Sequence, residues 1–320
     1  MSDKNLDNII EVKLSDKKIA TRQSYGESLA QLGEENEKIV VLDADLAGAT
    51  KTSIFAKKFP DRFFDIGIAE ADMIGTAAGF ATCGKIPYAS TFAMFAAGRA
   101  YDQIRNSVCY PKLNVKICAT HAGITVGEDG ATHQMLEDIS MMRTIPNMTV
   151  ISVSDDTQTR WAVEQISKIQ GPVYLRLSRL ATPIIYDKNQ KFEIGKAIQI
   201  GEGEDATIFA TGVTVSEAIS AKEELEKHGI NVRVVDIHTI KPIDKDIIIK
   251  CAKETKKLIS IEDHSIIGGL GTAISEVLTE NCPTNLIRLG IKDTFGKSGK
   301  AEDLMKYFEV DKEAIIKAMD

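Results

Sequence analysis

Short apolar runs of strand length alternate with longer amphipathic segments along almost the whole chain, and this alternation limits the possible folds more than any other feature. Runs such as 38–43, 115–119 and 148–153 are largely apolar, as strands buried on both faces of a sheet are. Segments such as 97–108 and 155–169 repeat apolar residues at helical spacing. The pattern predicts an α/β fold in which mostly parallel sheets are flanked by helices.

The alternation is interrupted once, between Pro183 and Lys196, where the chain becomes more polar before strands and helices resume. A chain of 320 residues is long enough for two ordinary domains. We therefore expect two α/β domains, at 17–186 and 187–320. A polar segment at 1–16 precedes them, and we expect it to be a loose N-terminal arm.

Composition excludes several classes of function. The formal net charge is -7, and no basic stripe of the kind that binds nucleic acid is present. The N-terminus lacks a signal-peptide core, and no apolar run has membrane-spanning length. The five cysteines are scattered and form no CxxC pair, which argues against structural zinc and predicts reduced thiols. We expect a cytoplasmic protein that binds neither nucleic acid nor membrane.

Glu70 is the first candidate for chemistry, because it stands at the predicted start of a helix with apolar residues on both sides. An acid at this position also occurs without any function, since it complements the unpaired N–H groups of the first turn. Phe92 and Phe95 follow the next strand and are either core residues or a binding surface. A carboxylate beside two phenylalanines suits a flat heteroaromatic ring, with stacking on the faces and a hydrogen bond to a ring nitrogen.

Further candidates follow other strands, and loops at the carboxyl ends of parallel strands gather at one edge of a sheet. His121 and His133 lie in one such loop with Asp129. These three side chains are of types that ligate metals, but their spacing in the sequence is not specific for a metal site, so we do not expect a metal there. Arg179 is either an anion clamp or a solvated charge at a strand end. The run 268–271 is glycine-rich, and we expect a tight turn there rather than a phosphate loop.

Six motifs, taken together and in order, resemble transketolase. They are DIGIAEADMIGTAAG, STFAMF, ATHAGITVGEDGATHQ, IPNM, LRLSR and DIHTIKPID…SIEDHSIIGGLG. The resemblance covers nearly the whole chain from Lys17 and concerns the pyrimidine-binding and C-terminal domains of that family. It implies a thiamine-diphosphate pyrimidine-binding fold followed by a transketolase C-terminal-domain-like fold.

The resemblance assigns four residues to the cofactor, thiamine diphosphate. Glu70 matches the acid that bonds the aminopyrimidine ring, which makes it a catalytic residue. Phe92 and Phe95 match the aromatic residues that stack on this ring. Leu46, in the loop after the strand at 38–43, matches a residue that lies against the same ring.

Five residues match the substrate-binding positions of the family. His121 and His133 match histidines around the reacting carbons of the sugar, where they orient hydroxyl groups and carry protons. Asp129 matches the residue that reads the configuration of an acceptor hydroxyl. Arg22 and Arg179 match arginines that hold the terminal phosphate of the sugar.

The chain departs from the family pattern at two points. Ala49 stands where a serine often helps to bind the phosphate, and Thr50 or Thr52 is a possible substitute; the terminal group is therefore a phosphate or another anion such as a sulfonate. The chain also has no Gly-Asp-Gly motif with a later Asn, which in this family holds the diphosphate through a divalent metal. The resemblance thus implies that a separate N-terminal transketolase subunit supplies this motif and the Mg²⁺ ligands, in an assembly with two of each chain.

The expected function is that of a split transketolase subunit, which moves a two-carbon glycolaldehyde unit from a ketose, such as a sugar phosphate, to an aldose. Two related alternatives remain open at this point. They are the β subunit of a 2-oxoacid dehydrogenase decarboxylase and a deoxyxylulose-phosphate-synthase-like enzyme with pyruvate as donor. A non-catalytic α/β scaffold subunit is the alternative from another class.

Overall fold

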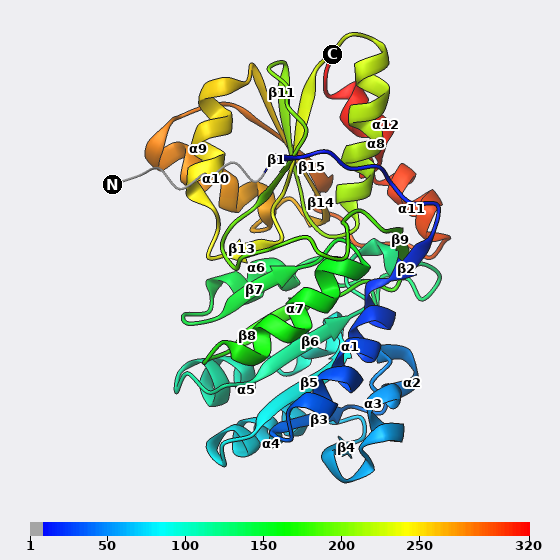
Figure 1. Cartoon of the computed structure of the whole chain (residues 1–320), viewed down its shortest axis with the longest axis vertical. Helices are drawn as coiled ribbons and strands as arrows, with labels where there is room; N and C mark the ends of the chain where they lie inside the picture. The colour runs from blue at the N-terminus through cyan, green and yellow to red at the C-terminus, as the bar shows by residue number, and fades with distance from the viewer. Residues whose placement is uncertain (1–8) are drawn as a thin grey trace.

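The chain folds into two lobes stacked along its longest axis (Figure 1), and the computed structural model describes residues 9–320. Each lobe contains one sheet that is mostly parallel and has helices on both faces. This confirms the predicted fold class. Most of the first lobe comes from the first half of the chain and most of the second lobe from the remainder, but each sheet takes one edge strand from the other part of the chain.

The first sheet has seven strands in the order β13-β7-β8-β6-β5-β3-β4, and all neighbours are parallel except β13 and β7. Strands β3 and β5 are buried along their whole length, which explains why they read as continuous apolar runs. The strands are β3 (Ile39–Asp43), β4 (Phe63–Asp65), β5 (Ile86–Phe92), β6 (Lys116–Thr120), β7 (Thr149–Ser152), β8 (Val173–Arg176) and β13 (Thr239–Lys241).

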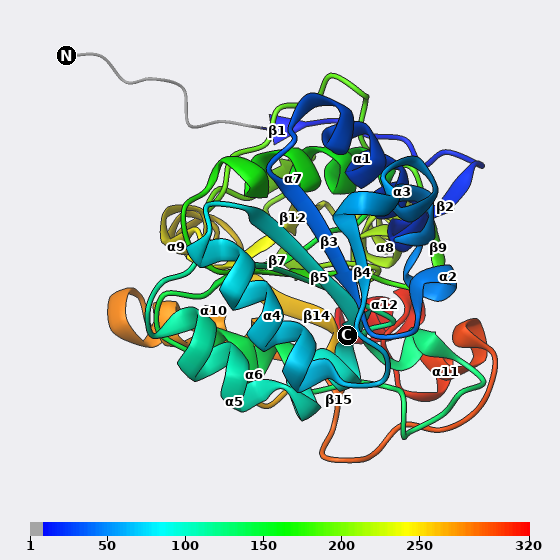
Figure 2. The ribbon, with the colours of Figure 1, turned by 90° about the horizontal axis from the view of Figure 1, so that it is seen from below.

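Helices cover both faces of this sheet, as the view from below shows (Figure 2). One face carries α4 (Glu70–Thr82), α5 (Tyr101–Gln103) and α6 (Asp138–Thr144). The other carries α1 (Thr21–Glu35), α3 (Ser53–Lys58) and α7 (Asp156–Lys168). The connecting turns are α2 (Ala47–Thr50), the 3₁₀ turns Pro60–Arg62 and Ile124–Val126, and the π-helical turns Met94–Arg99 and Ile104–Cys109.

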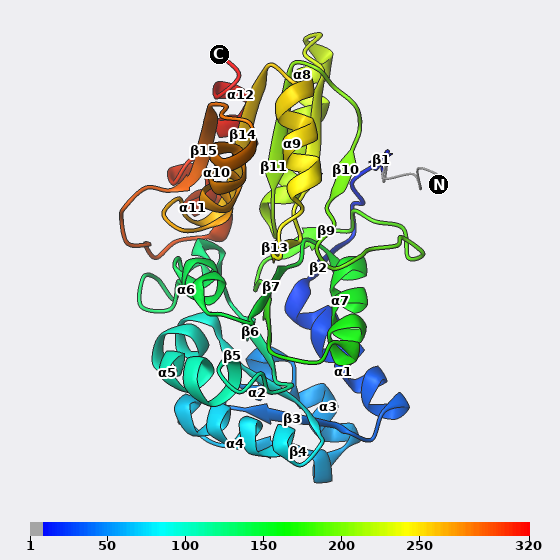
Figure 3. The same cartoon turned by 90° about the vertical axis from the view of Figure 1, so that its left-hand side faces the viewer.

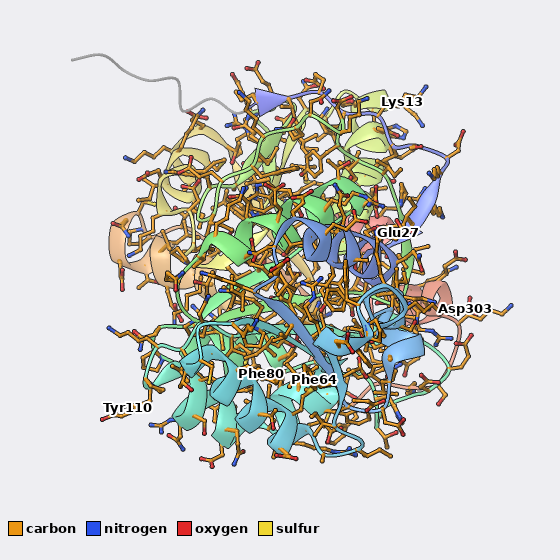
Figure 4. All side chains as sticks on the ribbon, turned by 60° about the horizontal axis from the view of Figure 1, so that its bottom comes forward. Lys13, Glu27, Phe64, Phe80, Tyr110 and Asp303 are labelled. Carbon is orange, nitrogen blue, oxygen red and sulfur yellow. The ribbon has the colours of Figure 1, made fainter. Side chains whose placement is uncertain are left out.

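Apolar side chains fasten α4 to the edge strand β4. Phe64 and Phe80 lie together at this edge (Figure 4), with ring centroids 4.8 Å apart. Met73, Ile74 and Ala77 of the same helix are fully buried. The helix that begins with Glu70 is thus held against the sheet by its apolar face, so its first residue has a fixed position.

Helix α1 differs from the prediction at both ends. A threonine at position 21 predicts an N-cap there, but the N-cap is Ala20, which makes no side-chain cap. A glycine at position 33 predicts the end of the helix, but the helix continues to Glu35. Gly33 is needed inside the helix because a Cβ there would lie 2.6 Å from the Phe55 ring and 2.7 Å from the Phe59 ring.

The second sheet has six strands in the order β1-β10-β12-β11-β14-β15. Helices α8 (Thr214–Lys227) and α12 (Lys312–Lys317) cover one face, and α9 (Lys245–Glu254) and α10 (Leu270–Asn281) the other (Figure 3). Helix α11 (Ala301–Tyr307) packs against the first lobe. The strands are β1 (Ile9–Ile10), β10 (Ile198–Ile200), β11 (Ala206–Ala210), β12 (Val232–Asp236), β14 (Lys257–Ser265) and β15 (Leu286–Ile291).

The expected loose arm is wrong for its described part. Ile9 and Ile10 form β1, which pairs in parallel with β10 at the edge of the second sheet. Val12 and Leu14 pack on the apolar core of the same lobe. Next, β2 (Lys18–Ala20) pairs with β9 (Ala181–Pro183). The remainder of the predicted arm, residues 1–8, lies outside the described residues. Within residues 9–320, every helix is too short or too polar to cross a membrane.

Candidate functional site

The loops after β3, β5, β6 and β8 meet at one edge of the first sheet, as their positions at the carboxyl ends of the strands require. A series of direct contacts joins the predicted residues there. Arg22 contacts His121, His121 stacks on Phe92, and Phe92 stacks on Phe95. Leu46 lies in the loop after β3, three residues before Ala49, whose carbonyl accepts a hydrogen bond from Arg22.

Glu70 is the first residue of α4 and is only 4% exposed. Its Oε1 accepts a hydrogen bond from Nη1 of Arg99 over 3.1 Å. The Arg99 guanidinium also lies 4.2 Å from the centre of the Phe95 ring. The carboxylate and the aromatic face that were predicted to share one ligand thus lie within reach of a single flat group.

Two phenylalanines and two histidines form one aromatic cluster. The Phe92 and Phe95 rings are nearly parallel, with centroids 5.8 Å apart. The His121 ring stacks on Phe92 at 3.7 Å, and His133 meets the Phe95 ring edge-on at 5.5 Å. Residues from two separate loops, at 92–95 and 121–133, therefore line one surface, as we expected from their places after successive strands.

The hydrogen bonds of His121 define its tautomer. Its Nε2 lies 3.2 Å from Nη1 of Arg22, and a guanidinium can only donate, so Nε2 accepts. Nδ1 therefore carries the proton and donates to the Thr120 hydroxyl over 2.9 Å. Burial, with smaller contributions from Arg22 and Arg179, lowers the pKa of His121 to about 3. The ring is neutral at physiological pH, and its one acceptor nitrogen, Nε2, is occupied by Arg22.

Arg22 contacts His121, and the charge of Arg179 also acts on the His121 ring. Arg22 is half-buried, and its Nε has no partner among the described residues. Arg179 donates to the Val126 carbonyl and to Glu128 Oε2, and its Nη1 lies 4.0 Å from Asp129 Oδ2. Burial and the neighbouring Arg179 charge lower the pKa of Arg22. The positive charges of Arg22 and Arg179 act on each other, and like charges gathered at one site indicate a place for an anion.

The prediction that Thr50 or Thr52 replaces the missing serine is wrong. Both hydroxyls donate to Oδ2 of the buried Asp43, over 2.7 and 2.8 Å. A hydroxyl has one proton to donate, and a phosphate or sulfonate oxygen requires donors. These threonines instead fix the turn that follows β3, and Leu46 N donates to Oδ1 of the same carboxyl group.

The second lobe holds the histidine loop in place. Asp263 of β14 is buried and accepts hydrogen bonds from Ile124 N and from the Thr125 hydroxyl, each over 2.8 Å. Gly123 has φ +79°, and a Cβ there would lie 2.0 Å from Asp263 Oδ2. Asp263 therefore anchors the loop that carries His121, although sequence reasoning gave it no role.

Known proteins that resemble this chain in sequence and fold identify its family. Residues 17–184 match the family model of the transketolase pyrimidine-binding domain, and 195–315 match that of the transketolase C-terminal domain. The chain belongs to the transketolase family. It is 54% identical to a transketolase C-terminal section from Methanocaldococcus jannaschii, over 96% of this chain and 97% of that protein.

Two further matches cover nearly the whole of both chains. One is a 6-deoxy-6-sulfo-D-fructose transketolase subunit, SqwH, from a Clostridium species, 43% identical over 96% of this chain and 95% of that subunit. The other is a split-gene transketolase solved as an inactive β4 tetramer, with a TM-score of 0.88 and 49% identity over 94% of this chain and 97% of that chain. By contrast, the chain spans 49% of the transketolase of Rattus norvegicus. It thus corresponds to the second half of a transketolase, the part expected from a split enzyme.

Two motifs of this transketolase half have structural roles. In the 268–271 turn, the amides of Leu270 and Gly271 donate to the carboxyl group of Glu262, so they are not free for a phosphate. Burial raises the pKa of Glu262 to about 7. His264 is fully buried, donates from Nδ1 to the Ser265 carbonyl, and accepts from a backbone amide of α6. These residues join the two lobes and lie apart from the aromatic cluster.

The site fits the pyrimidine half of thiamine diphosphate. Glu70 offers a buried carboxylate, and Phe95 offers a ring face beside it. Within residues 9–320, no three His, Cys, Asp or Glu side chains gather as a metal site. A cavity of about 480 Å³ lies elsewhere, between α1 and α7 next to Trp161, and no predicted site residue lines it.

Proposed function

We propose that this chain is the catalytic second subunit of a two-chain transketolase, which transfers a glycolaldehyde unit from a ketose to an aldose with thiamine diphosphate. The observation that carries the proposal is the position of Glu70. It is buried at the first residue of α4, beside the Phe95 face and at the same sheet edge as two histidines and two arginines. A carboxylate, a stacking surface and an anion site in this order suit the coenzyme and a sugar laid end to end.

Glu70 bonds the aminopyrimidine ring in this proposal, and Phe92, Phe95 and Leu46 hold the ring in place. When bound, thiamine diphosphate supplies the electron sink for breaking the carbon–carbon bond of the ketose. The buried carboxyl group of Glu70 is placed to share a hydrogen bond with a ring nitrogen in a setting from which water is largely excluded. Its fixed place at the start of α4 provides the orientation that proton sharing needs.

His121 and His133 act on the hydroxyl groups next to the reacting carbons. His121 is neutral with Nε2 unprotonated, so Nε2 accepts a hydrogen bond from a sugar hydroxyl once Arg22 turns from it to the anion of the sugar. His133 is partly exposed and is oriented by the Thr132 hydroxyl, 2.9 Å from its Nδ1. Asp129 reads an acceptor hydroxyl, for which it must loosen its 4.0 Å contact with Arg179.

The terminal group of the sugar is an anion in this proposal, held by Arg22, Arg179 and Lys51. Lys51 has a left-handed backbone conformation, with φ +72°. Its main chain packs against Gly26, and Gly26 lies one helical turn after Arg22 on α1. The inward hydroxyls of Thr50 and Thr52 fix the turn around it. Both phosphate and sulfonate fit three cations, and the similarity to the sulfofructose transketolase subunit supports testing both.

A partner chain completes the active site. We propose an N-terminal transketolase subunit that carries the Gly-Asp-Gly motif and binds the diphosphate through Mg²⁺. Two copies of each chain form the working assembly, with domains at 17–186 and 187–320 here. Ile68, two residues before Glu70, is 74% exposed and gives the site edge of the first sheet an apolar contact point for the partner.

The five cysteines are all free thiols, which supports a cytoplasmic location.

Reconstitution with the partner tests this function. The chain is co-purified with the subunit carrying Gly-Asp-Gly, and thiamine diphosphate and Mg²⁺ are added. Two-carbon exchange is then followed with ketoses that end in phosphate, sulfonate or a neutral hydroxyl group. We expect exchange with the complex and none with either chain alone. Decarboxylation of pyruvate with acyl transfer to lipoamide, or condensation of pyruvate with an aldose, would favour the alternative enzymes. A complex that binds no cofactor would favour a scaffold.

A further inference from the structure

Arg99 lies where the proposed ring-binding surface meets the proposed acid. Its Nη1 donates to Glu70 Oε1 over 3.1 Å, and its guanidinium carbon is 4.2 Å from the centre of the Phe95 ring. One flat cationic group therefore covers both the carboxylate oxygen and the ring face. The Arg99 side chain is 53% exposed, whereas that of Glu70 is 4% exposed. Arg99 is therefore free to swing outward, while Glu70 is fixed.

The backbone explains how Arg99 reaches this position. Phe95 and Arg99 are four residues apart on the π-helical turn Met94–Arg99, so their side chains share one side of the helix. The arginine side chain lies back over the Phe95 ring toward the start of α4. Helical turns of this kind often occur at functional sites.

We propose that Arg99 is a placeholder for the coenzyme ring: it covers Glu70 and Phe95 in the free chain, and the ring must displace it to bind. The inference rests on the proposed function, since the ring and the acid are those assigned above. A guanidinium is flat, stacks on aromatic faces and donates hydrogen bonds, so it imitates the edge and the face that an aminopyrimidine presents. It also gives a buried carboxylate the partner that such a group requires.

Displacement predicts that removing Arg99 strengthens coenzyme binding. The test compares Arg99→Met with the wild type in the complex of the full chain and its partner subunit. Thiamine diphosphate is titrated calorimetrically at fixed Mg²⁺. We expect the dissociation constant to fall about three- to tenfold, as for the loss of one partly exposed charge-assisted hydrogen bond. Arg105→Met is the matched control, because Arg105 is exposed on the same segment and its side chain donates to the neighbouring Asn106.

A second measurement separates this role from a structural one. Without coenzyme, Arg99→Met should lower the melting temperature of the full chain, because Glu70 loses its partner. At saturating coenzyme the difference in melting temperature should disappear. Arg99→Lys, which keeps the charge without the flat group, should behave in the same direction to a smaller degree. It serves as the test variant if Arg99→Met does not fold.

Each outcome of the coenzyme titration supports or overturns the inference. Weaker binding by the Arg99 variants would mean that Arg99 holds the coenzyme, and equal binding would mean that it does not compete; either result overturns the inference and leaves the proposed function intact. A folded wild-type complex that binds no thiamine diphosphate would overturn the proposed function and the inference together.

Discussion

At the scale of single residues, the role of Glu70 yields the most direct prediction. Glu70→Gln keeps the shape of the side chain but removes the group that shares a proton with the ring. Two-carbon exchange by the complex should fall at least about 100-fold, the usual contribution of one acid–base group. Folding should change little, since the amide still accepts from Arg99. Asp72→Asn is the control, because Asp72 is an exposed acid in the same first turn. Full activity of Glu70→Gln would remove Glu70 from the mechanism.

Lys51 yields a prediction about substrate choice. Lys51→Met should raise KM about tenfold for an aldose that ends in phosphate or sulfonate, because one cation of the anion site is lost. KM for an uncharged aldose such as glyceraldehyde should be unchanged. The measurement is steady-state exchange with the two acceptors under identical conditions. Lys57→Met, which removes an exposed lysine of α3, should alter neither constant. An equal effect on both acceptors would exclude contact of Lys51 with the anion.

Sequence reasoning found residues whose local pattern carries information and missed those that depend on long-range contacts. Glu70 and the two phenylalanines stand in short motifs that already suggest a ring site. Arg99 gave only a weak signal, its spacing of four from Phe95. Asp263 contacts a loop about 140 residues earlier in the chain, and no local pattern reports such a contact. Lys51 depends on a left-handed turn that the sequence does not announce.

At the scale of elements, the turn between β3 and α3 should respond to pH through Asp43. Burial raises the pKa of Asp43 from 3.8 to about 6. The folded state therefore binds this proton more tightly than the unfolded chain, so the stability that it contributes is present at low pH and is lost as pH rises through about 6. Asp43→Asn removes this dependence, and the threonine hydroxyls can turn to accept from the new amide.

Denaturant unfolding between pH 4.5 and 7.5 checks the prediction for Asp43. The free energy of unfolding of Asp43→Asn, relative to the wild type, should increase with pH. The slope for one proton is at most about 1.4 kcal/mol per pH unit. Parallel curves for the two proteins would mean that Asp43 has the same proton affinity in the folded and unfolded chains.

The segment after β1 gives a second prediction for an element. Val12 packs on the core of the second lobe, whereas Lys13 is exposed and points outward (Figure 4). Val12→Ser should lower the free energy of unfolding by about 1 kcal/mol, the value of a partly buried aliphatic side chain. Lys13→Ser should change it by less than about 0.5 kcal/mol. Equal effects in urea unfolding would restore the expectation of a loose arm.

Helices and strands with a strong apolar periodicity were predictable from the sequence. Short strands that form only by pairing with a strand distant in the sequence were not. The buried strands and the long helices α7, α8 and α9 follow from apolar spacing, and of the two adjacent acids that are candidate caps of α7, Asp155 is the one that caps it. The two-residue strand β1 exists only because β10 lies beside it. Strand β13 crosses from the second half of the chain to the edge of the first sheet. Gly33 looks like a stop signal, but the rings of Phe55 and Phe59 require a glycine inside α1.

At the scale of the whole molecule, the two lobes depend on each other to shape the site. The second lobe contributes Asp263, which fixes the histidine loop of the first. Arg176 at the end of β8 donates to Asp138 Oδ2 and to the Asp263 carbonyl, each over 2.8 Å. The second domain is therefore part of the machinery that positions His121, although it supplies none of the proposed catalytic groups.

This coupling predicts that Arg176→Met destabilises the whole chain. Asp138 is fully buried, and removing one partner of a buried ion pair costs about 3–5 kcal/mol because the other charge stays unpaired. Arg143→Met is the matched control, since Arg143 pairs across the lobes with Glu276, which is 55% exposed; it should cost less than about 1 kcal/mol. Urea unfolding followed by the fluorescence of Trp161, the single tryptophan, measures both. Equal losses would mean that the buried Arg176–Asp138 pair contributes no more to the free energy of unfolding than the exposed Arg143–Glu276 pair does.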